Sequence, residues 1–208
     1  MKKKLITIID YGMGNIVSIE NAIKYLNHEF ITTSDAKIIE KSNNLILPGV
    51  GSFYQAMIRL NKLGISNVIK KIANKKGNKI LGICLGMQLM AKVGYEDKKI
   101  NGLGLVNAEV KKFKLNKKIK IPHVGFNKVI TKDFKGLYKN LENLNYFYFT
   151  HSYKMSLIKK ENDFEYGYCD YGSKFLASFE NKKIFGTQYH PEKSQDNGLK
   201  ILKNFINL

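Results

Sequence analysis

Short apolar runs alternate with helix-like periodicity in the first half of the chain. Four of these runs are typical of strands buried on both faces: Leu5–Ile9, Phe30–Thr33, Leu45–Leu47 and Lys79–Ile83. Between and after them, apolar residues recur every three or four positions, which predicts helices over 16–26, 53–60, 65–73 and 85–92. The alternation of strands with helices predicts a mostly parallel sheet covered by helices on both faces.

The second half of the chain has a different residue pattern, in which short strand-like segments are separated by turn residues. These segments are Val106–Phe113, His123–Ile130, Tyr146–Phe149, Glu165–Cys169, Phe175–Phe179 and Ile184–Gln188. They predict a mixed or antiparallel extension of the sheet, and Gly198–Ile206 predicts a closing helix. No linker, repeat or low-complexity tract interrupts the chain, so we expect one α/β domain over residues 1–208.

The composition is that of an ordinary globular protein. In 208 residues, 44% are hydrophobic and 25% are charged, which excludes a wholly disordered chain. Two cysteines, Cys84 and Cys169, cannot form a disulfide framework, so we expect a reducing, cytoplasmic location. The apolar run at the N-terminus is too short for a signal peptide, and no run reaches the ~18 apolar residues of a membrane helix.

The strong positive charge raises the hypothesis of a nucleic-acid partner. Thirty-five Lys and Arg residues against 17 Asp and Glu give a formal net charge of +18. However, Arg59 is the only arginine, and recognition of bases and phosphates favours the planar arginine side chain. The lysines are also spread along the whole chain. A solvated lysine surface is therefore the favoured interpretation, with neither nucleic acid nor membrane as a partner.

The strongest local signal for chemistry is the segment Gly82–Gly86. An apolar strand leads into glycine, one residue, Cys84, one residue and glycine, and a helix follows. This is the nucleophile-elbow pattern with cysteine in place of serine. Such a turn holds the sulfur clear of its own strand, at a helix start where the dipole favours a thiolate. The segment alone fits a small buried cysteine at a strand end equally well.

A cysteine nucleophile needs a base and donors for the developing oxyanion. His190 follows a predicted strand, and Glu192, two residues later, could hold its imidazole in one tautomer. Alone, this segment would also fit a capped surface histidine. The glycine-rich segment Pro48–Gly51 follows another strand and could direct backbone N–H groups into a cleft, although an ordinary tight loop would look the same.

Other chemistries find less support in the sequence. The segment after the first strand has Val17 where the dinucleotide fingerprint needs its third glycine. A phosphate-binding Gly-Lys-Ser/Thr loop is absent, and the cysteines and histidines lack metal-ligand spacing. We therefore expect no cofactor and no metal.

Taken together, these segments resemble the class I (triad) glutamine amidotransferases. Gly-Ile-Cys-Leu-Gly-Met-Gln at 82–88 and His-Pro-Glu at 190–192 carry the resemblance. Supporting stretches occur in the family's order at 9–15, 47–51, 122–127, 149–153 and 189–194. The finer similarity is to the glutaminase subunits of imidazole glycerol phosphate synthase. The resemblance implies a flavodoxin-like three-layer sandwich.

The resemblance also implies roles for individual residues. Cys84 would attack the side-chain amide of glutamine, His190 would transfer protons, and Glu192 would orient it. Three residues would supply the backbone N–H groups of the oxyanion hole: Val50, Gly51 and Leu85. Five would hold the glutamine: Gly49, Gln88, His151, Ser152 and Tyr153.

A partner is implied as well, because free ammonia is largely protonated at neutral pH and then no longer nucleophilic. The chain ends with its last predicted helix, so we expect no ammonia-using domain fused to it. The resemblance implies that a separate (βα)8-barrel cyclase subunit uses the ammonia. The family positions near that interface are Gly12, Met13, Asn15, Phe126 and Lys193. In the family's Gly-Trp-Asn motif, this chain has Phe126 in place of tryptophan.

Two other functions remain open from the sequence. A paralogous subunit could supply ammonia for amidino-sugar synthesis with the same site residues. A stand-alone cysteine hydrolase on the same fold would act without a partner. The histidine-pathway enzyme is the favoured hypothesis over both, and over a non-catalytic binding protein.

Overall fold

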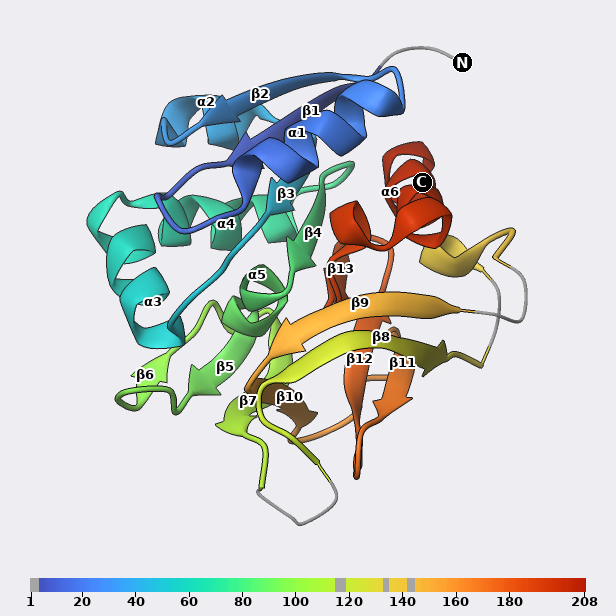
Figure 1. Ribbon diagram of the computed structural model, residues 1–208. Helices are drawn as coiled ribbons and strands as arrows, with labels where there is room; N and C mark the ends of the chain where they lie inside the picture. The colour runs from blue at the N-terminus through green and yellow to red at the C-terminus, as the bar shows by residue number, and fades with distance from the viewer. Residues whose placement is uncertain (1–3, 115–118, 133–134, 142–144) are drawn as a thin grey trace.

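A nine-stranded mixed sheet runs through the described part of the computed structural model, which covers residues 4–114, 119–132, 135–141 and 145–208 (Figure 1). Its strand order is β2-β1-β3-β4-β13-β12-β11-β8-β9. The parallel half contains β1 (Leu5–Ile9), β2 (Glu29–Thr33), β3 (Asn44–Leu47), β4 (Lys79–Ile83) and β13 (Ile184–Thr187). The antiparallel half contains β12 (Lys174–Glu180), β11 (Glu165–Asp170), β8 (His123–Ile130) and β9 (Tyr146–His151). The predicted antiparallel extension is confirmed.

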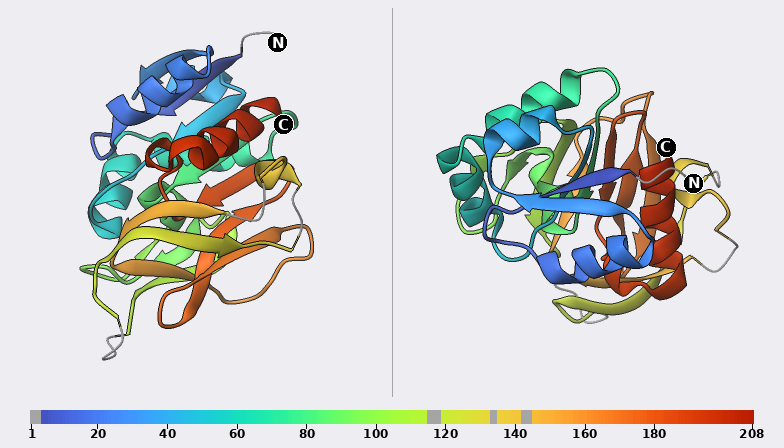
Figure 2. Two further views of the ribbon diagram at one scale, coloured as in Figure 1. Left: turned by 45° about the vertical axis from the view of Figure 1, so that its right-hand side comes forward. Right: turned by 90° about the horizontal axis from the view of Figure 1, so that it is seen from above.

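Helices cover both faces of the parallel half (Figure 2). On one face lie α1 (Ile16–Tyr25) and α6 (Gln195–Asn207); on the other lie α2 (Ala36–Lys41), α3 (Phe53–Lys62) and α4 (Ile65–Asn74). Successive side chains of a strand point to opposite faces. Accordingly, Ile46 joins the buried cluster under α1 and α6, whereas Leu45 and Leu47 join the cluster under the other helices. This is the expected three-layer sandwich.

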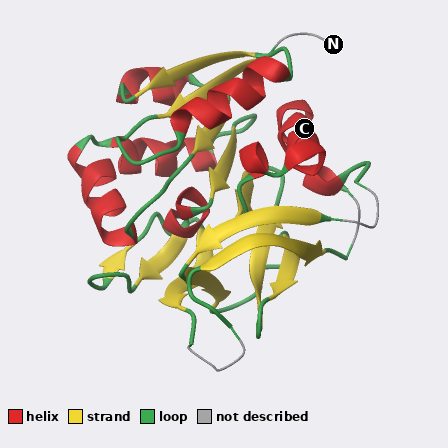
Figure 3. Ribbon diagram, viewed as in Figure 1, coloured by secondary structure: helices red, strands yellow, loops and turns green. Residues whose placement is uncertain are grey.

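A second sheet lies beside the first, and the sequence did not predict it (Figure 3). Its order is β10-β7-β5-β6, with β5 (Ala91–Gly94), β6 (Ile100–Asn101), β7 (Val106–Lys112) and β10 (Tyr153–Leu157). Two single-turn 3-10 helices are also present, η1 (Gly136–Tyr138) and η2 (Pro191–Lys193). The strand predicted over Val106–Phe113 is present, but it belongs to this small sheet and not to the extension of the large one.

The helix predicted over 85–92 is wrong in length. The structure ends α5 (Leu85–Leu89) early, and the chain turns into β5. The Leu89 carbonyl accepts from Leu103 N–H, and Ala91 pairs with Val106 of β7. These long-range hydrogen bonds replace the ones that would continue the helix, and no local pattern announces them.

The sequence analysis also missed α2. Asp35 occupies its N-cap, and the Asp35 carboxylate accepts a hydrogen bond from the Lys37 N–H at 2.7 Å. An aspartate before a short apolar pair is a helix-start signal that could have identified this helix. No described helix is long and apolar enough to cross a membrane.

Gly86 allows α5 to pack directly against β3. A Cβ at this position would overlap the Leu47 carbonyl oxygen, which is main chain and cannot rotate away. We expect Gly86→Ala to lower the free energy of unfolding by about 3 kcal/mol or more, measured by urea denaturation. Gly77→Ala is the control, because a Cβ at Gly77 meets nothing within 4 Å. Placing alanine at the left-handed φ of 82° should lower the free energy of unfolding of Gly77→Ala by only about 1–2 kcal/mol. Equal losses would contradict the packing explanation.

Candidate active site

Three neighbouring parallel strands deliver the candidate residues to one edge of the sheet. Leu47 of β3 pairs with Gly82 of β4, and Ile83 of β4 pairs with Thr187 of β13. Parallel strands end at the same edge, which is where binding crevices form in open α/β sheets. The segment Pro48–Gly51, the elbow cysteine and the histidine segment therefore meet, although up to 142 positions separate them along the chain.

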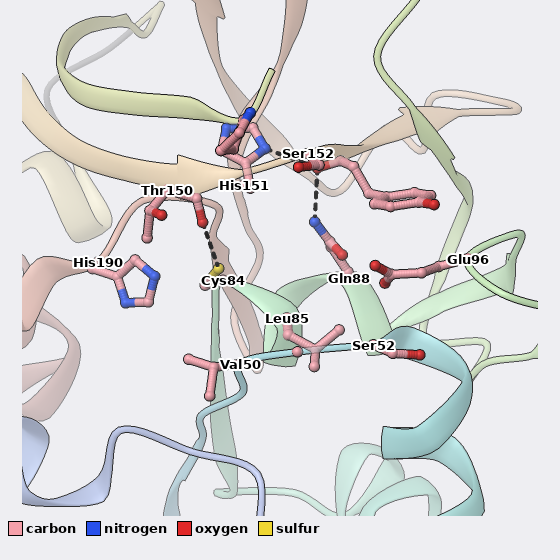
Figure 4. Close-up of a pocket in the computed structure, with 13 residues that line it drawn as sticks. Val50, Ser52, Cys84, Leu85, Gln88, Glu96, Thr150, His151, Ser152 and His190 are labelled. Atoms are coloured by element: carbon pink, nitrogen blue, oxygen red, sulfur yellow. Dashed lines mark hydrogen bonds between the residues drawn. The ribbon is translucent and has the colours of Figure 1, made fainter. Parts of the chain in front are cut away.

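Cys84 has the strained backbone expected of a nucleophile elbow. Its φ of 54° and ψ of −110° are unusual for a residue with a side chain, and its N–H donates to the Thr187 carbonyl at 2.7 Å. A Cβ at Gly82 would lie 2.7 Å from the Gly86 oxygen. The glycines thus let strand and helix approach closely, while the turn presents the sulfur to the cavity (Figure 4).

His190 is buried beside Cys84 and held by Glu192. The His190 Nδ1 and Glu192 Oε1 atoms are 2.8 Å apart, and the two side chains are 3% and 1% exposed. Burial alone would lower the pKa of His190, but the negative charges of Cys84 and Glu192 outweigh it and raise this pKa to about 10. Nε2 lies on the sulfur side of the ring (Figure 4), and its contact with the Cys84 side chain is one of the causes of the raised pKa. The arrangement supplies a nucleophile, a proton carrier and a group that orients the carrier.

A cavity of about 500 Å³ opens in front of the sulfur. It is lined by Val50, Gly51, Ser52, Cys84, Leu85, Gln88, Glu96, Pro122, Thr150, His151, Ser152, Tyr153 and His190. The sequence analysis assigned no role to Glu96, which lines this cavity together with Gln88 (Figure 4). The Glu96 carboxylate accepts from the Phe53 N–H at 2.8 Å, and burial raises its pKa. The preceding strand β5 was not predicted, so no local signal placed this carboxylate at the site.

Gln88 presents an acceptor to the cavity. Its Nε2 donates to the Tyr153 carbonyl and to Gln188 Oε1, at 2.9 Å each. Both amide protons are therefore used within the protein, and Oε1 is the atom that can accept a hydrogen bond from a ligand. Gly49 is not among the lining residues. A Cβ at Gly49 would lie 2.6 Å from the Tyr11 hydroxyl, so this glycine serves close packing behind the loop.

The imidazole of His151 is fully engaged inside the protein. His151 Nδ1 lies 2.8 Å from the Tyr153 carbonyl, and its Nε2 lies 3.0 Å from His123 Nδ1. On the far side, Asn127 Nδ2 lies 2.7 Å from His123 Nε2. One set of neutral tautomers satisfies all three contacts, with each ring donating from Nδ1. The His151 ring therefore has no nitrogen free for glutamine, and its imidazole contributes only to the cavity wall.

Burial keeps this histidine pair neutral. It lowers the pKa of His123 to about 4 and that of His151 to about 3. The unfolded chain binds protons near pH 6.5, so it gains protons on acidification before the folded chain does. The contribution of the neutral histidine pair to the free energy of unfolding is thus complete above pH 6.5 and is lost as the pH falls towards 4.

We expect His123→Gln to reduce the difference between the unfolding free energies at pH 7 and pH 5. The reduction should be about 2 kcal/mol, the contribution of one histidine with this shift. Urea denaturation at the two pH values measures it. An unchanged difference in a folded variant would show that His123 binds a proton equally well in the folded and the unfolded chain, which would contradict the lowered pKa.

The Val50 loop does not aim its N–H at the cavity. The Val50 N–H donates to the Met13 carbonyl at 3.0 Å, so it is already used. The Leu85 N–H lies in the first turn of α5, where helical N–H groups have no intrahelical acceptor. Gly51 has a φ of 94°, a conformation that glycine adopts readily. Of the three expected oxyanion donors, Val50 must therefore break a hydrogen bond before it can serve.

The residues predicted to contact a partner are accessible at the surface of the protein. Gly12 and Lys193 are exposed, Met13 and Asn15 are half-buried, and Phe126 is 45% exposed. Asn15 occupies the N-cap of α1, but its side chain makes no capping hydrogen bond. The Arg59 guanidinium donates to the Gly12 carbonyl at 3.1 Å and steadies the loop.

Comparisons with known proteins agree with this geometry. A subunit named HisH 1 of imidazole glycerol phosphate synthase from Campylobacter jejuni strain RM1221 is 41% identical over 204 residues, 98% of this chain and all of that protein. The HisH subunit from Caldanaerobacter subterraneus is 46% identical over 201 residues, 97% of each chain. Among solved structures, PurLQS from Thermotoga maritima has a TM-score of 0.68 at 19% identity, covering 99% of each chain, and shows the same fold.

The family model for class-I glutamine amidotransferases matches residues 7–208. That range includes the elbow cysteine, the histidine–glutamate pair and the glycine-rich loop. The chain belongs to the class I glutamine amidotransferase family.

Proposed function

We infer that this chain is the glutaminase subunit of an imidazole glycerol phosphate synthase, in which it releases ammonia from glutamine for a separate cyclase subunit. The observation that carries the inference is the joining of Cys84 and the His190–Glu192 pair at one cavity. Relatives 41–46% identical over nearly the whole chain are named as this subunit, which supports the choice among glutamine-using enzymes.

The chemistry proceeds through a thioester. The Cys84 sulfur attacks the amide carbon of glutamine, and the protonated His190 gives its proton to the leaving nitrogen, so ammonia departs. A water molecule then gives a proton to His190 and its oxygen to the acyl carbon. The carbon–sulfur bond breaks and glutamate leaves. Glu192 keeps Nε2 directed at the sulfur through both steps.

Two polar side chains that line the cavity, Glu96 and Gln88, would hold the α-ammonium group of the glutamine. The Glu96 carboxylate suits the α-ammonium group by charge, and Gln88 Oε1 can accept a second hydrogen bond from it. Ser152 and Tyr153 form the neighbouring wall, with the Tyr153 carbonyl fixed by Gln88. This arrangement places the side-chain amide of the substrate at the Cys84 end.

The Val50 loop links the partner surface to catalysis. The Val50 N–H is held by the Met13 carbonyl, and Met13 belongs to the predicted contact surface. A partner that moves the Met13 segment would release this N–H for the oxyanion. The isolated chain then lacks one oxyanion donor, and the loss of one such donor typically costs about 10²–10³-fold in kcat.

Glutamine hydrolysis measured with and without a partner tests this function. We expect slow glutamate formation by the isolated chain and a stimulation of about a hundredfold by the barrel cyclase subunit holding its ligand. Failure of this cyclase to stimulate hydrolysis, together with stimulation by an amidino-sugar synthase, would overturn the proposed pathway. Full activity alone on γ-glutamyl peptides would instead indicate a stand-alone hydrolase.

A further inference from the structure

Gln188 is a completely buried polar side chain that the proposed mechanism does not use. It follows β13 directly, two positions before His190, and its backbone N–H donates to the Ala177 carbonyl at 2.8 Å. Its side-chain Nε2 lies 3.7 Å from the Cys84 sulfur, within hydrogen-bond distance for sulfur. A buried amide is costly unless its polar atoms are satisfied.

The surrounding hydrogen bonds fix which end of the Gln188 amide faces the sulfur. Gln88 Nε2 lies between two oxygens, the Tyr153 carbonyl and Gln188 Oε1, and donates to both. Turning the Gln188 amide over would place its nitrogen against the Gln88 nitrogen, so that two donors would face each other. The Tyr153 carbonyl is itself held by His151 Nδ1 at 2.8 Å. The Gln188 N–H is therefore directed at Cys84.

Besides His190, the sulfur has two hydrogen-bond partners of opposite kinds, the Thr150 carbonyl and the Gln188 amide. The Thr150 carbonyl, 3.9 Å away, can only accept a hydrogen bond, so it suits the neutral S–H form (Figure 4). The Gln188 N–H can only donate at this contact, so it suits the negatively charged thiolate. A hydrogen bond to a charged acceptor is stronger than one between neutral groups.

We propose that Gln188 is a further catalytic residue, whose side-chain N–H stabilises the Cys84 thiolate and holds it on the line of attack. The proposal rests on the proposed function only in taking Cys84 as the nucleophile. No proton moves to or from Gln188. When the sulfur electron pair forms the bond to the acyl carbon, this N–H loses a charged acceptor, and it regains one when the thioester breaks.

Alkylation of Cys84 by iodoacetamide as a function of pH tests the proposal in the isolated full chain, without glutamine or partner. Gln188→Met keeps the approximate volume but removes the donor, and Gln188→Glu keeps the shape but replaces the amide by a carboxylate. We expect both to move the rising limb of the Cys84 rate profile about one unit to higher pH. Gln55→Glu, the same exchange on the exposed side of α3, should leave the profile unchanged.

Other titratable groups near the sulfur are unchanged in these variants. Among the described residues they include His190, His151 and Glu96 at the cavity and Tyr11 behind the loop. Mass analysis of the Cys84 peptide separates its signal from that of Cys169, which is buried and whose pKa burial raises to about 12. A folded Gln188→Met chain with the wild-type profile would overturn the proposal.

If both variants fail to fold, an NMR measurement on the wild type tests whether the Gln188 N–H binds the Cys84 thiolate. The side-chain amide protons of Gln188, assigned by NMR, should shift downfield over the same pH interval in which Cys84 becomes reactive. A flat signal through that interval would also overturn the proposal. Both readouts are independent of glutaminase activity. If Cys84→Ala retains activity while these readouts behave as expected, the proposed function fails and the Gln188 contact stands.

Discussion

Cys84→Ala is expected to abolish the partner-stimulated hydrolysis of glutamine, with a fall in kcat of at least about ten-thousand-fold. Alanine has no atom that can form the thioester, and no other described cysteine lines the cavity. The measurement is glutamate release by the complex at saturating glutamine. Burst kinetics should also lose the acyl-enzyme phase, because the covalent intermediate cannot form.

Cys169→Ala is the matched control for this substitution. Cys169 is also buried, but it lies on β11 within the apolar cluster under α1 and α6, away from the cavity lining. It should retain kcat within about twofold and lose some stability through the small hole it leaves. If Cys84→Ala keeps a substantial share of the wild-type rate while remaining bound to its partner, Cys84 is not the nucleophile.

Glu192→Gln is expected to lower kcat by about 10³–10⁴-fold, with little change in KM. The Glu192 carboxylate lies 2.8 Å from His190 Nδ1 and fixes the tautomer that directs Nε2 towards Cys84. An amide has the same shape but no charge, and it can turn its nitrogen towards Nδ1 and select the wrong tautomer. Glutamine binding uses other walls of the cavity and should persist.

The pH dependence of the same variant gives a second readout. The Cys84 and Glu192 charges raise the pKa of His190 to about 10 against the effect of burial. Removing the carboxylate removes one of these charges, so the imidazolium loses its proton at lower pH. We expect the alkaline limb of the activity profile to move to lower pH. Glu29→Gln, an exposed glutamate at the start of β2, should leave the profile unchanged. If Glu192→Gln keeps the wild-type kcat and the wild-type pH dependence of activity, Glu192 does not orient His190 during catalysis.

Two exposed apolar side chains bear on the kind of partner. Phe126, one of the predicted contact residues, is 45% exposed, and Val50, which lines the cavity, is 43% exposed. Phosphate backbones are bound mainly by basic side chains, so exposed apolar groups at these positions agree better with a protein partner than with a nucleic acid.

Local sequence determined the elements whose signals are short-range. The apolar runs of β1, β3 and β4 are buried on both faces by any parallel sheet, so their pattern was sufficient to identify them. The two glycines of the elbow are close to each other in the sequence, and so are His190 and Glu192. Each of these two motifs is therefore a short-range signal. The sequence alone therefore determined the α/β class and supplied the candidates for the nucleophile, the base and the orienting carboxylate.

The tertiary structure decided everything that depends on a distant hydrogen-bond partner. Leu103 and Val106 end α5 early, and the Met13 carbonyl occupies the Val50 N–H. His123 takes a ring nitrogen of His151, which removes that imidazole from the binding groups. Each polar group can form only a limited number of hydrogen bonds. Which partners it binds is decided only when segments far apart in the chain pack together.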